Sequence, residues 1–477
     1  MDDLRQRFAT LDRVPVPDVW SDVERRLEAL GPAMRSGGLA PVKREPRGAR
    51  ADTPSGATTP LGDRRTVALL AAAALLAALL VGSAIAVGSG LVRLSTVVPP
   101  LPSPPSLLTD TPSPVAPAVG QWIATGNMVE IRFGETATLL PNGNVLVAGG
   151  NPQFNRRGLS RATAELYDPS TGRWTLTGSM REAREGHAAV RLANGQVLVL
   201  GGGDASDARP ARLLSSAELY DPNTGMWTDT GQLTSARSGA TATFLPDGTV
   251  LVTGGVSSSA DRPERSAEIY DPVTGTWAKT GSMSVARNGH TATLLPDGHV
   301  LVVGGQCCTE PAVASAELYD PVNGTWSGTG ALGEARRNHT AVLLLNGKVL
   351  VYGGDRGNSR SPGIGTAELY DPVTGVWVAT GSQGSAGNLF EAQGGGQPKP
   401  LPDGNVLAAT YGGAGELYDP SSGSWTTIGG LGGDLYTYIH TSTLLVDGRV
   451  LVTSEQWPAA GGGPLPAAML FDPDGTP

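Results

Sequence analysis

The sequence predicts an all-β fold, a seven-bladed β-propeller in which each blade is a sheet of four antiparallel strands. From residue 121 onward, the 477-residue chain repeats a unit of about 50 residues, and such a period is typical of repeat architectures. Each unit contains two hairpin signals. Glycine supplies 66 residues, while charged residues make up only 17%. This composition favours many short strands joined by tight turns, because glycine adopts positive φ without steric cost.

The first half of the unit reads TATLLPDGxVLVxGG and predicts strands a and b. Two apolar, β-branched runs flank an Asn-Gly or Asp-Gly dipeptide, the strongest short signal for a β-hairpin. We therefore expect a type I′ turn between strands a and b. The dipeptide occupies this place in seven successive units, at Asn142-Gly143, Asn194-Gly195, Asp247-Gly248, Asp297-Gly298, Asn346-Gly347, Asp403-Gly404 and Asp447-Gly448.

The second half of the unit reads SAELYDPxTGxW and predicts strands c and d, the outer pair of each blade. Large aromatic side chains fill the space between blades, which widens toward the rim. In six units a Trp follows a Tyr by seven positions, as Tyr167 and Trp174, Tyr220 and Trp227, Tyr270 and Trp277, Tyr319 and Trp326, Tyr370 and Trp377, and Tyr418 and Trp425.

The seventh unit is incomplete at its C-terminal end. It stops at FDPDGTP, with Phe471 at the Tyr position and no Trp after it. A segment that matches strand d stands at the other end of the repeat region, as GQWIATGNM around Trp122. We therefore predict that this N-terminal strand completes the last blade, which leaves the ring without an open edge.

Two charged positions also repeat. Glu precedes Leu-Tyr-Asp or Ile-Tyr-Asp in six units, and Arg precedes strand a in five. We expect a structural ion pair that locks strand c to the start of strand a. The residues are Glu165, Glu218, Glu268, Glu317, Glu368 and Glu416, with Arg132, Arg184, Arg237, Arg287 and Arg336.

A Gly-Gly doublet followed by Tyr and Trp, in four-stranded units of about 50 residues, resembles the kelch repeat. The wording ELYDPxTGxW is similar to bacterial kelch proteins and to the central propeller domain of galactose oxidase. The resemblance covers residues 121–477. It implies the fold and leaves the function open, because propellers host unrelated activities.

The likeness to galactose oxidase raises a copper–radical enzyme as one alternative. That family's site requires two His and two Tyr ligands, with one Tyr linked to a Cys. Here His187, His290, His339 and His440 share one repeat position, and the only cysteines are adjacent. We therefore predict a non-enzymatic protein with no catalytic residues, no metal and no cofactor; a carbohydrate-active enzyme remains an alternative.

The region before the propeller predicts a membrane anchor. Residues 66–92 lack any charge, and about 20 apolar residues suffice to span a bilayer as a helix. Arg64 and Arg65 precede this run and only Arg93 follows it, so the positive-inside rule places the N-terminus in the cytoplasm. Residues 93–118 are rich in Pro and Ser and predict an extended extracytoplasmic stalk, which carries the propeller at 119–477.

Residues 1–65 predict a cytoplasmic tail with two short amphipathic helices. Part of the tail resembles the cytoplasmic heads of bacterial anti-sigma-like regulators, which implies a cytoplasmic protein partner. Beyond this tail, 34 Asp and Glu outnumber 23 Lys and Arg, which argues against nucleic acid as a partner. Cys307 and Cys308 are either a vicinal disulfide or two free thiols.

Strand alternation puts the a–b and c–d turns on one face of the ring and the variable b–c and d–a loops on the other. Binding usually resides in variable loops on a rigid scaffold, so we expect a protein or glycan ligand at the second face. The alternative is a transmembrane signal regulator that acts through its tail. The repeat pattern breaks in the last two units, where we place the ligand-binding candidates Asn388, Phe390, Tyr436, Tyr438, Glu455 and Trp457.

Overall fold

The computed structural model describes the propeller region in ten segments: residues 120–152, 159–205, 212–257, 262–306, 311–357, 363–384, 400–409, 414–430, 436–457 and 465–475. The predicted tail at 1–65, membrane helix at 66–92 and stalk at 93–118 lie outside these segments. Within the ten segments, no helix has the length and apolar character needed to cross a membrane.

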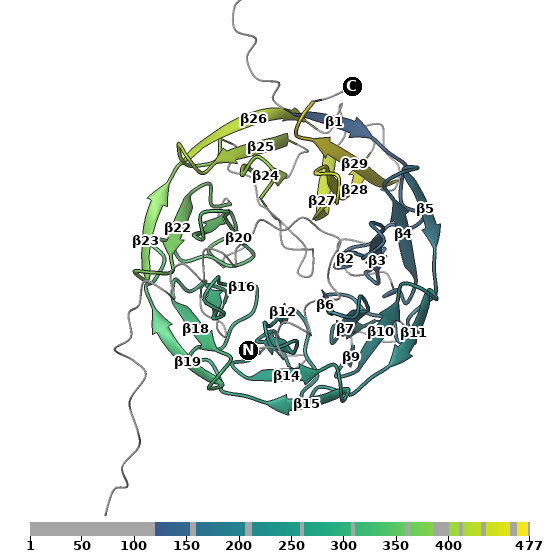
Figure 1. Ribbon diagram of the computed structural model, residues 1–477, viewed down its shortest axis with the longest axis horizontal. Coiled ribbons are helices and arrows are strands. Elements are labelled where there is room, and N and C mark those ends of the chain that lie inside the picture. Colours follow the sequence, from purple (N-terminus) through teal and green to yellow (C-terminus); the bar gives the residue numbers. More distant parts are fainter. Residues whose placement is uncertain are drawn as a thin grey trace, which may run out of the picture. The chain divides into compact units, whose positions relative to one another are not determined.

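Seven β-sheets surround a central axis and form the blades of a propeller, which confirms the predicted fold (Figure 1). Blades one to five each have four antiparallel strands, ordered a to d from the axis outward. Blade one contains β2(Thr136–Leu139), β3(Val145–Ala148), β4(Ala164–Asp168) and β5(Arg173–Leu176), and blade two contains β6(Ala188–Arg191), β7(Val197–Leu200), β10(Ala217–Asp221) and β11(Met226–Asp229). Blade three contains β12(Thr241–Phe244), β13(Val250–Thr253), β14(Ala267–Asp271) and β15(Thr276–Lys279), and blade four contains β16(Thr291–Leu294), β17(Val300–Val303), β18(Ala316–Asp320) and β19(Thr325–Thr329). Blade five contains β20(Thr340–Leu343), β21(Val349–Tyr352), β22(Ala367–Asp371) and β23(Val376–Thr380).

Blade six shows three strands in the described segments, and blade two carries a small extra hairpin in its b–c loop. Strand a, predicted for blade six, would fall largely in residues 385–399, which lie outside those segments. The strands of blade six are β24(Val406–Ala409), β25(Ala414–Asp419) and β26(Ser424–Gly430), and the extra hairpin is β8(Gly203–Asp204) with β9(Arg212–Leu213).

Blade seven joins the two ends of the described chain, as the sequence predicts. Its sheet has the order β1-β29-β28-β27, formed by β27(Tyr436–Leu444), β28(Val450–Trp457), β29(Leu465–Asp472) and the N-terminal β1(Gln121–Ala124). Trp122 lies opposite Phe471 in the ladder, and their ring centroids are 5.2 Å apart. The ring is therefore closed by hydrogen bonds between segments from opposite ends of the sequence.

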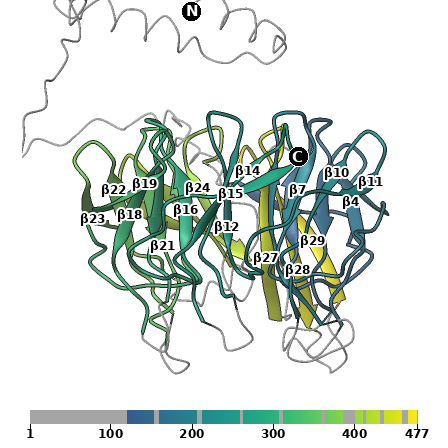
Figure 2. The same ribbon diagram turned by 90° about the horizontal axis from the view of Figure 1, so that it is seen from below.

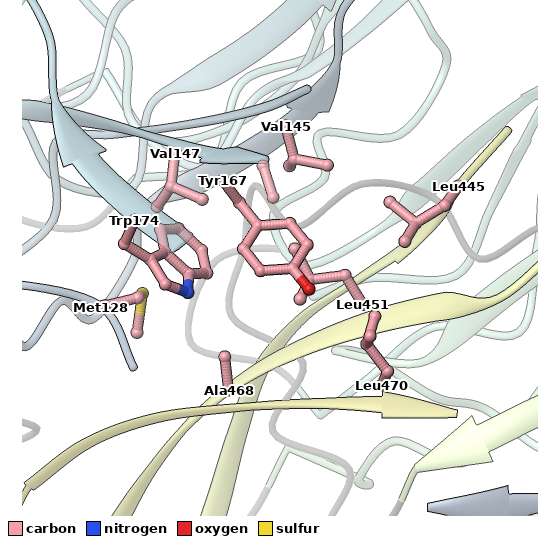
Figure 3. Packing of buried hydrophobic residues seen from close by; sticks show 10 residues of the cluster. Met128, Val145, Val147, Tyr167, Trp174, Leu445, Leu451, Ala468 and Leu470 are labelled. Atoms are coloured by element: carbon pink, nitrogen blue, oxygen red, sulfur yellow. The ribbon is translucent and has the colours of Figure 1, made fainter. Parts of the chain in front are cut away.

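The core lies in the seams between neighbouring blades. All four residues of strand b are buried in each of blades one to five, and the strand-c tyrosines are buried as well. In Figure 3, Tyr167 of blade one stands between Trp174 on its own blade and Leu451 of blade seven, within one apolar cluster. Burial of such aromatic rings contributes several kcal/mol to each seam, at about 25 cal/mol per Å².

Two hydrogen bonds recur across six seams and explain why Tyr and Trp repeat. The Tyr hydroxyl lies 2.7–2.9 Å from a Thr hydroxyl at the end of strand d in the preceding blade. The Trp indole N–H donates to a Gly carbonyl oxygen beside that Thr, at 2.7–2.8 Å. At the seam between blades six and seven, Phe471 replaces the Tyr and Ile428 replaces the Thr, and the two share an apolar cluster.

The predicted type I′ turn between strands a and b is wrong. Among the described residues other than glycine, only Asn338 has positive φ, whereas a type I′ turn requires positive φ at both central positions. In blade one, the Gly143 N–H donates to the Leu140 carbonyl and Leu140 N–H donates to Asn144. This is the pattern of a type I turn followed by a left-handed glycine. Pro141, with φ fixed near −65°, fits the first position of this turn, and blades two, five and seven form the same turn with Ala193, Leu345 and Val446 in its place.

Candidate interaction face

The two faces of the ring differ in their regularity. We call the face with the a–b and c–d turns the turn face and the opposite one the loop face. On the turn face, the glycine of the Asn/Asp-Gly dipeptide has φ between 81° and 90° in all seven blades. Figure 2 shows these short turns along one edge of the ring, opposite the longer connections. Since the turn face repeats the same geometry, a distinguishing site is expected on the loop face.

Beneath the loop face, the predicted Arg–Glu pair is present in five blades, which confirms that prediction. Arg237 and Glu268 are both fully buried, with 2.7 Å between guanidinium nitrogen and carboxylate oxygen. The guanidinium also donates to the Gly254 carbonyl, and the carboxylate accepts from the Thr234 N–H. The other pairs are Arg132–Glu165, Arg184–Glu218, Arg287–Glu317 and Arg336–Glu368.

The repeated histidines are seam contacts. His187 of blade two lies 3.0 Å from the Thr136 hydroxyl of blade one. Burial, with the nearby Arg184 and Arg132 charges, lowers the pKa of His187 to about 3, so the ring is neutral at pH 7. His290 and His339 make the same kind of contact with threonines. Within the described segments, no three His, Cys, Asp or Glu side chains cluster closely enough to hold a metal ion.

The Gly-Gly doublet provides the space that each of these histidines fills. A Cβ atom on Gly149 would stand 2.6 Å from the Cε1 atom of His187, and one on Gly254 would stand 2.5 Å from that of His290. Both glycines have positive φ, so the chain turns away from the sheet here. The doublet therefore interrupts the a–b ladder, which resumes beyond it as a single bridge in blades one to five, such as Phe133 with Asn151, and leaves room for the neighbouring blade.

Blade seven keeps the His, as His440, but departs from this plan at the other positions. Thr437 replaces the Arg, Met469 the Glu, Ile439 the glycine before the His, and Ser454-Glu455 the Gly-Gly doublet. None of these residues has positive φ. The ladder therefore continues, so β27 has nine residues and β28 has eight, against four in the corresponding strands of blades one to five.

Four of the six predicted ligand-binding residues lie on this longer ladder, in strands and not in loops as we expected. Tyr436 pairs with Trp457, and Tyr438 pairs with Glu455. Glu455 is fully buried, so it lies beneath the surface of any site here. Asn388, Phe390 and the cysteine pair Cys307-Cys308 lie outside the described residues.

Within this ladder, His440 contacts blade one. The register shifts between Ile439 and Thr441, which leaves His440 as a β-bulge residue. Bulges often redirect a side chain, and here the His440 ring lies against Phe133, with centroids 4.5 Å apart. Its Nδ1 atom is 3.3 Å from the carboxylate of Glu135, and both groups are buried.

Sequence reasoning missed Glu135 and Phe133. The available signal was that Glu135 takes the position held by His in blades two, four, five and seven. The Thr453 hydroxyl donates to the same carboxylate at 3.4 Å. Blade one and the C-terminal strands of blade seven are thus joined through polar groups at the closing seam.

Comparison with known families identifies the repeat. A family model described as the KLHDC2/KLHL20/DRC7 Kelch-repeats domain matches residues 134–354. A second model, the Kelch motif, matches residues 336–382.

Curated relatives match over shorter stretches. The Kelch-like protein terF of Aspergillus terreus is 30% identical over 152 residues, which are 31% of this chain and 33% of that protein. Spermatocyte protein spe-26 of Caenorhabditis elegans is 31% identical over 21% of this chain and 17% of its own. Beta-scruin of Limulus polyphemus is 24% identical over 30% and 15%. The matches thus span a third or less of each relative.

Among solved structures, a copper-bound fungal alcohol oxidase of the AA5 family is similar in fold, with a TM-score of 0.56 and 19% identity. The match covers 74% of this chain and 76% of that one, and at this identity it supports the fold alone. The repeat in the sequence, the matches to the two kelch family models and the seven sheets agree, and the chain carries a seven-bladed β-propeller of kelch repeats.

Proposed function

We propose that this propeller is a non-enzymatic interaction module that binds a protein or glycan ligand on its loop face, around blade seven. The observation that carries the proposal is the coordinated loss of the Arg, the Glu and the glycines in one blade. Each of these groups makes the contacts described above in blades one to five. A fold gives up such contacts most often at a functional site, and the result here is a sheet that extends beyond its neighbours.

The proposed display on a membrane rests on the uncharged run at 66–92 and on the direction of β1. Gln121 pairs with Asp472, the residue at which β29 ends, so β1 begins at the turn face. The described chain therefore enters the propeller at the turn face, at Gly120, and the loop face lies on the other side of the ring. This arrangement supports a module that is held by one side and binds with the other.

The binding proposal is tested by comparing two classes of variant. The full-length protein, in detergent or lipid nanodiscs, is screened against a glycan array and a displayed peptide library. We expect Tyr438→Ala or Trp457→Ala to weaken binding of the recovered ligands by about tenfold, or about 1.4 kcal/mol. The turn-face control Asp297→Ala should bind as the wild type does. If Asp297→Ala alone weakened binding, the site would lie on the turn face and the proposal would be rejected.

The topology proposal has a separate test. Protease added to sealed spheroplasts that express the full chain should cut the stalk or the propeller and leave residues 1–65 intact. Degradation of the tail with a protected propeller would reverse the proposed orientation.

A further inference from the structure

The innermost strand of blade seven has a long edge. In blades one to five the innermost strand has four residues, whereas β27 has nine. At about 3.3 Å per residue, nine residues extend about 30 Å, whereas in blades one to five the four-residue strand is followed toward the loop face by one isolated bridge, such as Phe133 with Asn151. The yellow strands of blade seven reach further toward the loop face than the strands around them (Figure 2).

This edge carries main-chain groups that the ladder does not use. β27 is the terminal strand in the order β1-β29-β28-β27, and across the described segments only β28 pairs with it. Every second residue of an edge strand directs its N–H and C=O away from the sheet. Folded proteins usually keep such edges short because a long one is a template for another strand. Blades one to five break this edge at the Gly-Gly doublet and resume it for a single bridge, whereas β27 stays paired with β28 from Tyr436 to Leu444.

The sheet behind this edge is rigid enough to serve as a template. β28 pairs with β27 up to Trp457 and with β29(Leu465–Asp472) from Val450 to Gln456. Glu455, Ser454 and Thr437 are buried, and the bulge residue His440 lies against Glu135 of blade one. The loop-face part of β27, residues 436–440, is therefore held in an extended conformation by β28, by β29 behind it and by blade one.

We propose that the ligand is an extended polypeptide segment that adds to β27 as a further strand, along residues 436–440. This inference rests on the proposed function and names its ligand class. Donors and acceptors spaced along a strand match a second peptide main chain, and strand addition of this kind is a recurrent mode of peptide binding. A glycan lacks that spacing. The bulge at His440 interrupts the register, so pairing should stop there.

The register also predicts how the peptide is selected. Positions 436, 438, 455 and 457 share one side of the sheet, since Tyr436 pairs with Trp457 and Tyr438 with Glu455. Thr453 lies on that same side by strand alternation, and it bonds Glu135 of blade one. Alternate side chains of an added strand would therefore lie toward blade one, and the intervening ones toward blade six.

A variant of blade seven that regains the repeat residues provides the test. The substitutions Thr437→Arg, Ile439→Gly, Ser454→Gly, Glu455→Gly and Met469→Glu together restore the residues that accompany the break in the ladder in blades one to five. We expect this full-length variant to fold, as judged by circular dichroism and its melting temperature. Twelve-residue peptides selected on the wild type from a random displayed library should bind it at least about tenfold more weakly.

A second measurement does not depend on that variant. Each main-chain amide of a selected peptide is N-methylated in turn, which removes one N–H donor. Strand addition predicts that binding falls at every second position only, because alternate N–H groups point to β27.

The outcomes separate the two proposals. Equal binding to the restored variant, or N-methyl effects without a period of two, would overturn strand addition. Recovery of glycans and no peptides, with binding lost in Tyr438→Ala, would overturn strand addition and leave the loop-face site standing. Loss of binding in Asp297→Ala alone would overturn the proposed function itself.

Discussion

The indole N–H of Trp174 donates a hydrogen bond of 2.7 Å to the carbonyl oxygen of Gly126. Trp174 belongs to blade one, whereas Gly126 follows β1, the strand that completes blade seven. The same bond joins successive blades elsewhere in the ring. At this seam it joins the first complete blade to the last, so the closure uses the same chemistry as every ordinary seam.

Deletion of residues 119–128 should destabilise the propeller strongly. It removes β1, the Trp122–Phe471 contact and the acceptor of the Trp174 indole. Replacement of a packed Trp by Ala alone costs about 3–5 kcal/mol, and loss of the whole strand also exposes the edge of β29. Thermal unfolding by circular dichroism is the measurement, with deletion of residues 43–52 as the control. An unchanged melting temperature would contradict the role of β1 in closure.

Arg237→Met should destabilise the protein by about 3–5 kcal/mol, because it leaves the carboxylate of Glu268 buried without its partner. The double variant Arg237→Met with Glu268→Leu should recover much of that loss, since no unpaired charge remains. Recovery is expected to be incomplete because the Thr234 N–H loses its acceptor. Urea unfolding of the wild type, both single variants and the double variant gives the coupling energy. Additive single effects would argue against the pair.

Stability should fall as the pH drops from 7 to 5. Burial lowers the pKa of His290 to about 3, and likewise that of His187, whereas the unfolded chain titrates near 6.5. Below pH 6.5 the unfolded state therefore binds more protons than the folded state, and each histidine removes about 1.4 kcal/mol per pH unit.

The contribution of one histidine is isolated by His290→Gln, which should give a shallower dependence of unfolding free energy on pH. His299, a half-exposed residue at an a–b turn, offers the matched control His299→Gln. A slope that both variants leave unchanged would contradict the seam assignment of His290.

Gly254→Ala and Gly248→Ala separate two costs of replacing a glycine. Both residues have positive φ, 61° and 87°, so each substitution incurs about 1–2 kcal/mol of backbone strain. At Gly248 an added Cβ meets no atom within 4 Å, whereas at Gly254 it stands 2.5 Å from His290. We expect Gly254→Ala to be worse by about 1–3 kcal/mol. Equal melting temperatures of the two variants would show that the seam adapts.

Much of the fold could be predicted because the same strand, turn and aromatic positions recur in seven successive units. The pairing of Glu268 with Arg237 followed from two charged positions that recur together. The turn type was missed because the Asn/Asp-Gly signal was read as a two-residue loop. The loop has three residues in every blade, with or without a Pro at its first position, and a three-residue loop takes a type I turn followed by a left-handed glycine.

The candidate site was only partly predictable. The departures at Thr437 and Met469 were visible in the sequence, but we assigned the aromatic residues near them to loops. The structure shows a longer ladder, since Ile439, Ser454 and Glu455 do not adopt the left-handed conformation that interrupts it elsewhere. The contact of Glu135 with His440 depends on two residues from opposite ends of the repeat region, which no local pattern reveals.

The composition of blade seven also has a consequence for biosynthesis. β1 is among the first parts of the propeller to be translated, while its partner β29 is among the last. In a nascent chain, β1 therefore stays unpaired with β29 while six blades are synthesised, and the contacts of β1 are strongly non-local. A chain that terminates anywhere before residue 465 lacks the partner of β1 and cannot close. Ring closure thus requires synthesis to have proceeded through β29, and a product that stops earlier keeps an exposed strand edge, which favours aggregation and proteolysis.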